Sequence, residues 1–298
     1  MRLSCRACNN QLSQEILDLG HQPPSNSYLT KDDLNKKEIT YPMRVFVCTK
    51  CWLVQLPAHT EARELFNDNY AYFSSTSQSW CDHAKKYVYE TQKKLNLNEK
   101  SLVIEIASND GYLLQYFKKI NIDCIGIEPT KKVAEASRKK GIKTIESFFG
   151  SAFADKLLKD DLSNSRKADL IIANNVIAHV PDLNDFIDGI SKVLKYEGIL
   201  SIEFPHLLNL VKLNQFDTIY HEHYSYFSLF TIEKIFKKHG LYIFDVETLR
   251  THGGSLRIWL SKKIYIENCK KKLRIIENET KFGLQGLEAF KNFQNRAL

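Results

Sequence analysis

The fold of this chain is decided by the stretch Leu102-Val103-Ile104-Glu105-Ile106-Ala107-Ser108-Asn109-Asp110-Gly111-Tyr112. Its mostly apolar first half is typical of a buried strand, and small and polar residues follow as a turn. A turn from a parallel strand into a helix lets the backbone approach a ligand at the helix N-terminus. The turn has one glycine and lacks the GxGxxG spacing that cradles a pyrophosphate. This favours an adenosine ligand without phosphates over NAD.

Further apolar runs recur on the C-terminal side of this stretch, with helical segments between most of them. They cover residues 122–127, 143–145, 169–173, 199–204, 241–246 and 255–260. Near-continuous apolar strands separated by helices indicate a parallel sheet covered on both faces. The last two runs lack a connection of helix length, so they are predicted to be antiparallel. The sequence therefore predicts an α/β fold with seven strands, mostly parallel, that ends in an antiparallel hairpin.

Helical periodicity marks several segments around these strands. Asp182 is placed to cap a helix over 182–195, and Thr231 to cap another that stops at Gly240. Helices are also predicted over 79–94 and 264–298.

Polar residues follow two of the predicted strands. Glu128 ends the second strand, twenty-three positions after Glu105, where a carboxylate can accept both hydroxyls of a ribose. His179 lies at the carboxyl end of the fourth strand, where open α/β sheets bind their ligands. The structural alternatives are an ordinary acidic strand end and a histidine satisfied within a loop.

A polar cluster occupies residues 216–227, which hold two imidazoles, two carboxylates, three phenols and two further hydroxyls. No periodicity explains these side chains as a core face. An HExxH metal motif starting at His221 would need a histidine in place of Ser225. Two interpretations remain, namely histidines hydrogen-bonded under a loop and acid–base machinery that removes a proton alpha to a carbonyl. The second is favoured.

Two CxxC pairs lie in the first part of the chain, and their members are Cys5, Cys8, Cys48 and Cys51. Each pair can present two sulfurs to one ion, which suits tetrahedral zinc. Because all four positions are thiolates, the zinc ion is expected to be structural. Loop signals at 23–26 and a strand-like run at 43–47 lie between the two pairs.

Bulk properties narrow the class of protein. The 298 residues carry a net charge of +7, and the lysines fall as scattered pairs, which favours solvated helix faces over a nucleic-acid stripe. No run approaches the ~18 apolar residues of a membrane span, and the first ten residues lack a signal-peptide core. We therefore expect a cytoplasmic protein with no nucleic-acid or membrane partner, as a monomer or weak dimer.

Taken in order, the motifs resemble those of a known enzyme family. The two CxxC pairs, EIASNDG, GIEP, NVIAHV, YHEH and HGGSLR are similar to the zinc-containing, S-adenosylmethionine-dependent sugar C-methyltransferases. These enzymes methylate C3 of nucleotide-linked 4-keto-deoxysugars. The resemblance covers essentially the whole chain. It implies a class I methyltransferase domain, a structural Zn²⁺ and a role in branched deoxysugar biosynthesis.

The resemblance also implies roles for individual residues. His223 is expected to be the general base, and its active-site companions are Tyr220, Glu222, His179 and an upstream tyrosine, either Tyr72 or Tyr70. The phenols or His179 would stabilise an enolate oxygen, while Glu222 would orient a sugar hydroxyl or an imidazole. Residues expected at the methyl donor are Glu105, Ala107, Ser108, Asn109, Gly111, Glu128 and Asn174.

Three parts of the chain are predicted, and they bear on the alternatives for function. They are a zinc-binding module over 1–65, a methyltransferase domain over 66–262, and a helical start of a truncated C-terminal domain over 263–298. Members of the resembled family continue for about a domain's length of chain that helps to hold the nucleotide sugar. The alternatives are an O- or N-methyltransferase on another small acceptor, and a non-catalytic, donor-binding zinc protein.

Overall fold

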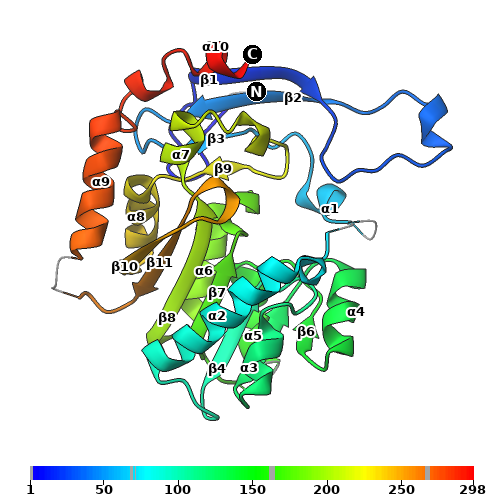
Figure 1. Ribbon diagram of the computed structural model, residues 1–298, viewed down its shortest axis with the longest axis vertical. Helices are drawn as coiled ribbons and strands as arrows, with labels where there is room; N and C mark the ends of the chain where they lie inside the picture. Colours follow the sequence, from blue (N-terminus) through cyan, green and yellow to red (C-terminus); the bar gives the residue numbers. More distant parts are fainter. Residues whose placement is uncertain (1–2, 68–69, 71, 161–164, 266–268) are drawn as a thin grey trace.

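Two β-sheets organise the computed structural model, which describes residues 3–67, 70, 72–160, 165–265 and 269–298 (Figure 1). The strands are β1 Gln14–Gln22, β2 Tyr41–Val47, β3 Val54–Gln55, β4 Leu102–Ile106, β5 Asp123–Ile127, β6 Lys143–Ile145, β7 Ala168–Asn174, β8 Leu194–Pro205, β9 Ser225–Tyr226, β10 Tyr242–Leu249 and β11 Ser255–Ser261. The α-helices are α1 Ala62–Leu65, α2 Gln78–Leu95, α3 Leu114–Lys119, α4 Lys131–Lys139, α5 Ser151–Lys159, α6 Leu183–Val193, α7 Leu207–Lys212, α8 Leu229–Lys238, α9 Lys270–Phe282 and α10 Phe293–Ala297. The short 3-10 helices are η1 Asp33–Asn35, η2 Ser74–Thr76, η3 Ile177–His179, η4 Phe216–Thr218, η5 Thr251–Gly253 and η6 Glu288–Phe290.

The larger sheet confirms the predicted α/β fold. Its seven strands have the order β10-β11-β8-β7-β4-β5-β6. The strands from β8 to β6 are parallel, whereas β11 is antiparallel to both β8 and β10. Helices α5, α6 and α8 pack with Ile104 and Ile106 on one face, and α2 and α3 pack with Val103 on the other. Because side chains alternate along a strand, Glu105 points into the α2–α3 layer.

Two predicted helices illustrate how local signals set helix ends. Asp182 caps α6 as predicted and accepts a hydrogen bond from the Asp185 amide at 3.0 Å. The predicted cap at Thr231 is wrong, because Ser228 caps α8 and accepts from the Thr231 amide at 3.1 Å. Leu229, directly after Ser228, belongs to the buried face of α8, so the helix begins before Thr231.

The prediction of one helix over 264–298 is also wrong in part. Helix α9 ends at Phe282, where Gly283 adopts a left-handed conformation with φ 89°. The Leu284 amide then donates to the Glu279 carbonyl at 3.1 Å, which closes the helix end. The chain turns there, and η6 and α10 follow as separate short elements.

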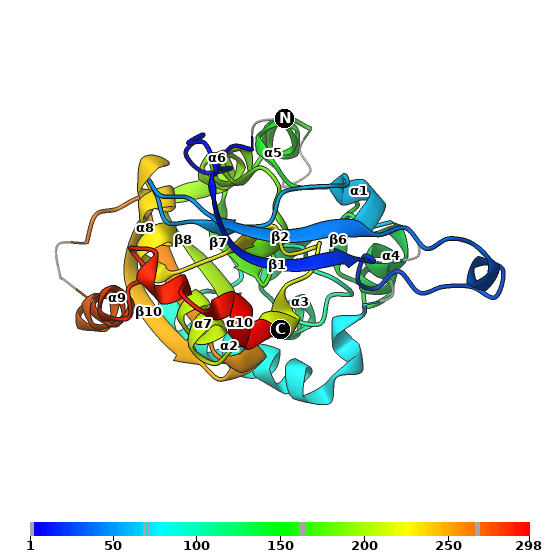
Figure 2. The same cartoon turned by 90° about the horizontal axis from the view of Figure 1, so that it is seen from above.

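The smaller sheet has the order β1-β2-β3-β9 and joins distant parts of the chain. Its strand β9 belongs to the polar cluster at 216–227, and it pairs antiparallel with β3. The apolar face of this sheet packs against α7 and against Leu284, Phe290 and Phe293 near the C-terminus. Figures 1 and 2 show helix α10 lying beside β1 at this end of the molecule. The polar cluster is therefore anchored on the smaller sheet.

The connection between β1 and β2, residues 23–40, extends away from both sheets in the two views (Figures 1 and 2). Within the ranges described above, no helix combines the length and apolar character needed to cross a membrane.

Candidate active site

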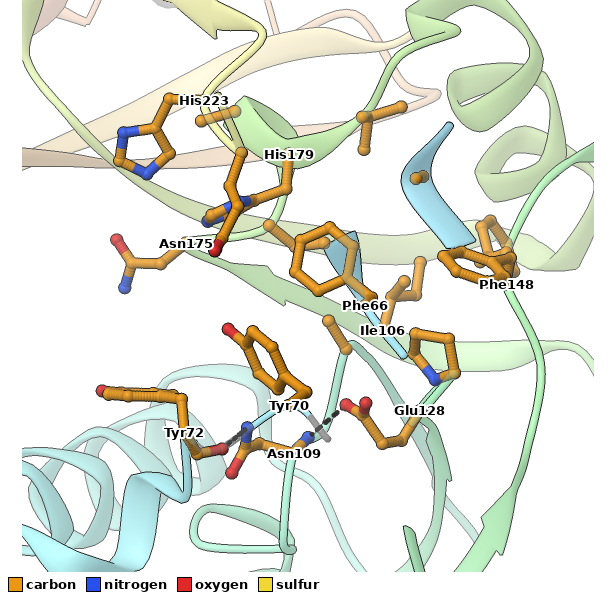
Figure 3. Close-up of a pocket in the computed structure, with 18 of the residues that line it drawn as sticks. Phe66, Tyr70, Tyr72, Ile106, Asn109, Glu128, Phe148, Asn175, His179 and His223 are labelled. Atoms are coloured by element: carbon orange, nitrogen blue, oxygen red, sulfur yellow. Dashed lines mark hydrogen bonds between the residues drawn. The ribbon is translucent and has the colours of Figure 1, made fainter. Parts of the chain in front are cut away.

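A pocket of about 680 Å³ lies at the carboxyl ends of the parallel strands. Ile106, Ile127 and Asn174 reach it from the ends of β4, β5 and β7, and the polar cluster and the α1 region close its other side. Figure 3 shows Glu128 and Asn109 on one wall, with His179 and His223 on the facing wall. A site at this edge is where open α/β sheets bind their ligands.

Glu128 anchors the wall that was predicted to hold a methyl donor. Its two carboxylate oxygens accept from the Asn109 amide at 3.0 Å and from the Thr130 amide at 2.9 Å. Each oxygen keeps a further lone pair, so the carboxylate can still accept hydrogen bonds from a ligand. Burial raises the pKa of the Glu128 carboxyl, and the two backbone amides oppose this change.

The predicted donor-site residues divide into two groups. Those that line the pocket are Ala107, Asn109, Glu128 and Asn174; those that do not are Glu105, Ser108 and Gly111. Ala107 adopts φ 55°, a left-handed conformation that is least strained for glycine.

Packing explains why the second group lies away from the pocket. Glu105 points into the α2–α3 layer, and burial raises its pKa well above the ordinary value. Ser108 fills the space beside Gly126, where a Cβ would meet its hydroxyl. A Cβ on Gly111 would meet Ile142 and Ser137, so this glycine serves the close packing of α4.

Buried polar atoms without a protein partner point to a polar ligand in the pocket. They include the Asn174 Oδ1 atom, both amide atoms of Asn175 and the Nδ1 atom of His179, for which the described residues offer no hydrogen bond. Native proteins rarely leave such atoms unsatisfied. Apolar side chains that suit an adenine ring lie close to Glu128, namely Pro129, Phe148 and Phe149. The pocket therefore fits a nucleoside with a polar tail, as S-adenosylmethionine has.

His223 and Tyr220 form a hydrogen-bonded pair on the opposite wall. The His223 Nδ1 atom lies 2.8 Å from the Thr218 carbonyl, and its Nε2 atom lies 2.9 Å from the Tyr220 hydroxyl. A carbonyl can only accept, so Nδ1 carries the hydrogen and Nε2 offers its lone pair to the phenol. Burial lowers the pKa of His223 to about 4. The imidazole is therefore neutral near pH 7 and can act as a base.

His179 lies beside this pair at the end of η3. The ring centroids of His179 and His223 are 4.6 Å apart. Burial, followed by the nearby His223, lowers the pKa of His179 well below its ordinary value. The Tyr224 amide donates to the Ala178 carbonyl at 2.8 Å, so the backbones that carry the two histidines are bonded to each other.

Glu222 and His221 occupy different positions although they are adjacent in sequence. Glu222 lines the pocket, and its Oε1 atom accepts from the Ser25 hydroxyl at 3.0 Å and from the Asn26 side-chain amide at 2.9 Å. Burial raises its pKa. His221 lies outside the pocket lining, with Nε2 at 3.3 Å from the Tyr41 carbonyl. The structural interpretation therefore applies to His221, whereas His223 faces the cavity.

The two candidate upstream tyrosines both line the pocket. Tyr70 packs against Phe66 with ring centroids 5.3 Å apart, and burial raises its pKa. Tyr72 is exposed, and its carbonyl accepts from the Asn109 side chain at 3.2 Å. Both phenols lie on the donor wall in Figure 3, so either remains a candidate.

Some lining residues were not identified from the sequence. They include Asn26, Trp80, Asn175 and His252. His252 belongs to the HGGSLR motif, and its left-handed φ of 49° is a signal that only coordinates reveal. Asn175 adjoins the predicted Asn174 and could have been found from that neighbour. Asn26 and Trp80 had no local signal.

The four predicted zinc ligands converge at one point. Their sulfurs lie within 4.8 Å of one another, with 3.5 Å between Cys5 and Cys51 and 3.6 Å between Cys8 and Cys48. A tetrahedral ion with bonds of about 2.3 Å to sulfur requires about 3.8 Å between ligands. Hydrogen bonds from Cys51 and the Gln55 side chain hold the pKa of Cys5 below its ordinary value. The donor set fits a structural Zn²⁺.

Comparison with known proteins gives the family. A family model described as "Putative zinc binding domain" matches residues 5–66, and one described as "Methyltransferase domain" matches residues 77–246, more than half of the chain. The chain belongs to the methyltransferase-domain family. This membership confirms the predicted class I fold and S-adenosylmethionine as the cofactor of that fold. The zinc-binding model and the four converging cysteines confirm the zinc site.

Two curated relatives are similar to this chain. C-methyltransferase NovU of Streptomyces niveus is 32% identical over 255 residues, which are 86% of this chain and 60% of NovU. Ubiquinone biosynthesis O-methyltransferase of Pelagibacter ubique is 26% identical over 113 residues, 37% of this chain and 45% of the relative. The chain thus spans less than two thirds of the length of either relative.

Solved structures with similar coordinates include PH0226 protein from Pyrococcus horikoshii OT3, with a TM-score of 0.49 and 14% identity over 64% of this chain and 95% of that one. Magnesium protoporphyrin IX methyltransferase from Synechocystis PCC 6803 with bound SAH has a TM-score of 0.46 and 15% identity, over 66% of this chain and 91% of that one.

Proposed function

We propose that this methyltransferase transfers the methyl group of S-adenosylmethionine to C3 of a nucleotide-linked 4-keto-deoxysugar. The observation that carries the proposal is the His223–Tyr220 pair, because a neutral imidazole with its lone pair at the pocket wall is equipped to deprotonate carbon. An O- or N-methyltransferase needs no base of that kind. The name of the relative C-methyltransferase NovU supports carbon as the acceptor atom.

The first step is removal of the C3 proton. The Nε2 lone pair of His223 takes this proton once the Tyr220 hydroxyl has turned away from it. The C–H bond breaks, an N–H bond forms, and the electron pair moves into the C4 carbonyl to give an enolate. The hydroxyl of Tyr220 is then free to donate to the new oxyanion, which lowers the barrier. The hydrogen bond from Nδ1 to Thr218 stabilises the imidazolium that results.

Other residues hold the two substrates in the proposed site. S-adenosylmethionine, when bound, would supply an electrophilic methyl group for the enolate carbon, with S-adenosylhomocysteine as the leaving group. Glu128 would accept from the ribose hydroxyls, while Asn109 and Asn174 would contact the rest of the donor. Glu222 would orient a sugar hydroxyl, because its Oε2 atom remains available beside the Oε1 atom bound to the loop at 25–26. Tyr70 or Tyr72 would pack on the sugar side of the donor.

Exchange of the C3 proton with deuterated water tests the base directly. The wild-type chain, supplied with S-adenosylhomocysteine and a nucleotide-linked 4-keto-deoxysugar, should exchange the C3 proton without methylation. His223→Gln should slow this exchange by about 10² or more, as expected for loss of a general base. Its affinity for S-adenosylhomocysteine, measured by calorimetry, should stay within twofold of the wild type.

His221→Gln is the matched control, because the adjacent histidine lies outside the pocket lining, and it should exchange as the wild type does. Undiminished exchange in His223→Gln would remove His223 from the base role. Methyl transfer to another acceptor without any C3 exchange would favour an O- or N-methyltransferase. Binding of S-adenosylhomocysteine with neither activity would favour a non-catalytic protein.

A further inference from the structure

We propose that Arg6, which lies between the zinc ligands Cys5 and Cys8, is a positioning residue. It holds His179 and His223 in their positions relative to each other. The inference rests on the roles proposed for His179 and His223. Arg6 does not line the pocket, and it lies between the cysteines Cys5 and Cys8. Its side chain reaches from the zinc site to both backbone segments that carry the histidines.

The guanidinium of Arg6 donates to two backbone carbonyls. Its Nη1 atom lies 2.9 Å from the Pro181 oxygen, and its Nη2 atom lies 2.6 Å from the Leu56 oxygen. Pro181 follows His179 by two residues, and Leu56 follows strand β3. The planar guanidinium therefore fixes the loop after η3 relative to the zinc module.

The same guanidinium lies over the ring of Tyr224, with its carbon 5.3 Å from the ring centroid. Tyr224 follows His223 directly, and its carbonyl accepts from the Leu56 amide at 3.1 Å. A cation placed over a phenol ring is attracted by the ring electrons. Arg6 thus contacts the Pro181 carbonyl that follows His179 and the ring of Tyr224 that follows His223. The hydrogen bond from the Tyr224 amide to the Ala178 carbonyl joins these two segments.

The backbone of Arg6 is fixed as firmly as its side chain. Its amide donates to the Gln55 side chain at 3.0 Å, and its carbonyl accepts from the Asn184 side chain at 3.1 Å. Gln55 in turn donates to the Cys5 sulfur at 3.3 Å. The position of the guanidinium therefore depends on the geometry of the four cysteines.

Electrostatics explain why a partly buried cation is tolerated here. Burial lowers the pKa of Arg6 to about 10, and the nearby Tyr224 and Cys5 oppose this change. Four thiolates around Zn²⁺ carry a net charge of about −2, which further favours the guanidinium. The cost of this partly buried charge is better explained by the three directed contacts of the guanidinium, to the Pro181 and Leu56 carbonyls and to the Tyr224 ring, than by stability alone.

The test compares Arg6→Met and Arg6→Lys with the control Arg44→Met. Arg44 lies on β2 of the same module, where it is exposed and pairs with Glu15. Measurements on the zinc-loaded chain are zinc content, S-adenosylhomocysteine affinity and the pH titration of the imidazole protons by NMR. The groups that face His223, which are Tyr220, Tyr226, His179 and His252, are unchanged in all three variants.

Arg6→Met should keep zinc and S-adenosylhomocysteine affinity within twofold of wild type. Without the contacts of the Arg6 guanidinium, water reaches the two histidines. The pKa of His223 should therefore rise from about 4 toward its ordinary value by about one unit or more. C3-proton exchange should slow by about 10- to 100-fold, the usual cost of a misplaced catalytic group. Arg6→Lys should recover only part of this loss, because an ammonium group cannot span both carbonyls. Arg44→Met should behave as the wild type.

The proposal would be overturned if His179 and His223 titrated at the same pH in a zinc-loaded Arg6→Met chain as in the wild type. Loss of zinc from both Arg6 variants would also overturn it, because Arg6 would then stabilise the zinc site rather than position the histidines. Absence of C3 exchange in the wild type would refute the proposed function alone, since the NMR titration still decides the role of Arg6.

Discussion

The low pKa of His223 predicts how the stability of this protein depends on pH. In the folded chain burial lowers this pKa from 6.5 to about 4. Between these two values the unfolded chain binds more protons than the folded chain, so the free energy of unfolding falls as the pH falls through this window. The full change corresponds to about 3 kcal/mol, of which about 2 kcal/mol belongs to the interval from pH 7 to pH 5.

His223→Gln removes this titration while an amide can still bond to Tyr220 and to the Thr218 carbonyl. The free energy of unfolding in urea should therefore fall by about 2 kcal/mol less in the variant than in the wild type between pH 7 and pH 5. Other groups that titrate in this range, including the zinc thiolates, are common to both chains and cancel in the difference.

His21→Gln is the control, because its side chain is exposed on β1, and it should keep the wild-type dependence on pH. An equal loss of stability in wild type and His223→Gln would refute the reasoning, since it would mean that His223 titrates alike in the folded and unfolded chains.

Two further predictions concern the buried carboxylates of Glu279 and Glu128. Glu279 is fully buried and accepts from His206 at 2.6 Å and from the first two amides of α8 at 2.6 and 3.0 Å. Glu279→Ala should lower the free energy of unfolding by about 3–5 kcal/mol, because these donors lose their partner. The control Glu277→Ala, at an exposed position of the same helix, should leave it nearly unchanged. A small effect of Glu279→Ala in urea unfolding would show that the C-terminal helices contribute little to the fold. Glu128→Gln should weaken S-adenosylhomocysteine binding in calorimetry by about tenfold or more, since hydrogen bonds to a charged acceptor are lost. The control Asp123→Asn, at the other end of β5, should bind as the wild type does. Equal affinities of Glu128→Gln and the wild type would place the ribose elsewhere.

Much of the fold follows from local patterns. The seven apolar runs became the seven strands of the larger sheet, because a strand buried on both faces needs apolar residues along its whole length. The two CxxC pairs met at one site, since each pair fixes two sulfurs by its own spacing. The ends of the helices were predicted less accurately than the strands. Ser228 rather than Thr231 caps α8, and Gly283 interrupts the predicted C-terminal helix.

The candidate site could be predicted only in part. The sequence placed Glu128, Asn174, His179 and the polar cluster at one edge of the sheet, because parallel strands end on the same side. It could not tell which of the donor-site candidates face the ligand. Glu105 lies one position too early on β4, and the alternation of side chains turns it into the α2–α3 layer.

By itself the sequence determined the α/β architecture, the zinc ligands and the place of the polar cluster, because each depends on residues near one another in the chain. Only the tertiary structure decided that His223 faces the pocket while His221 binds the Tyr41 carbonyl. That choice depends on the pairing of β9 with β3, two strands that come from distant parts of the chain. Contacts of this kind leave no periodic pattern, so they are visible only once the chain is folded.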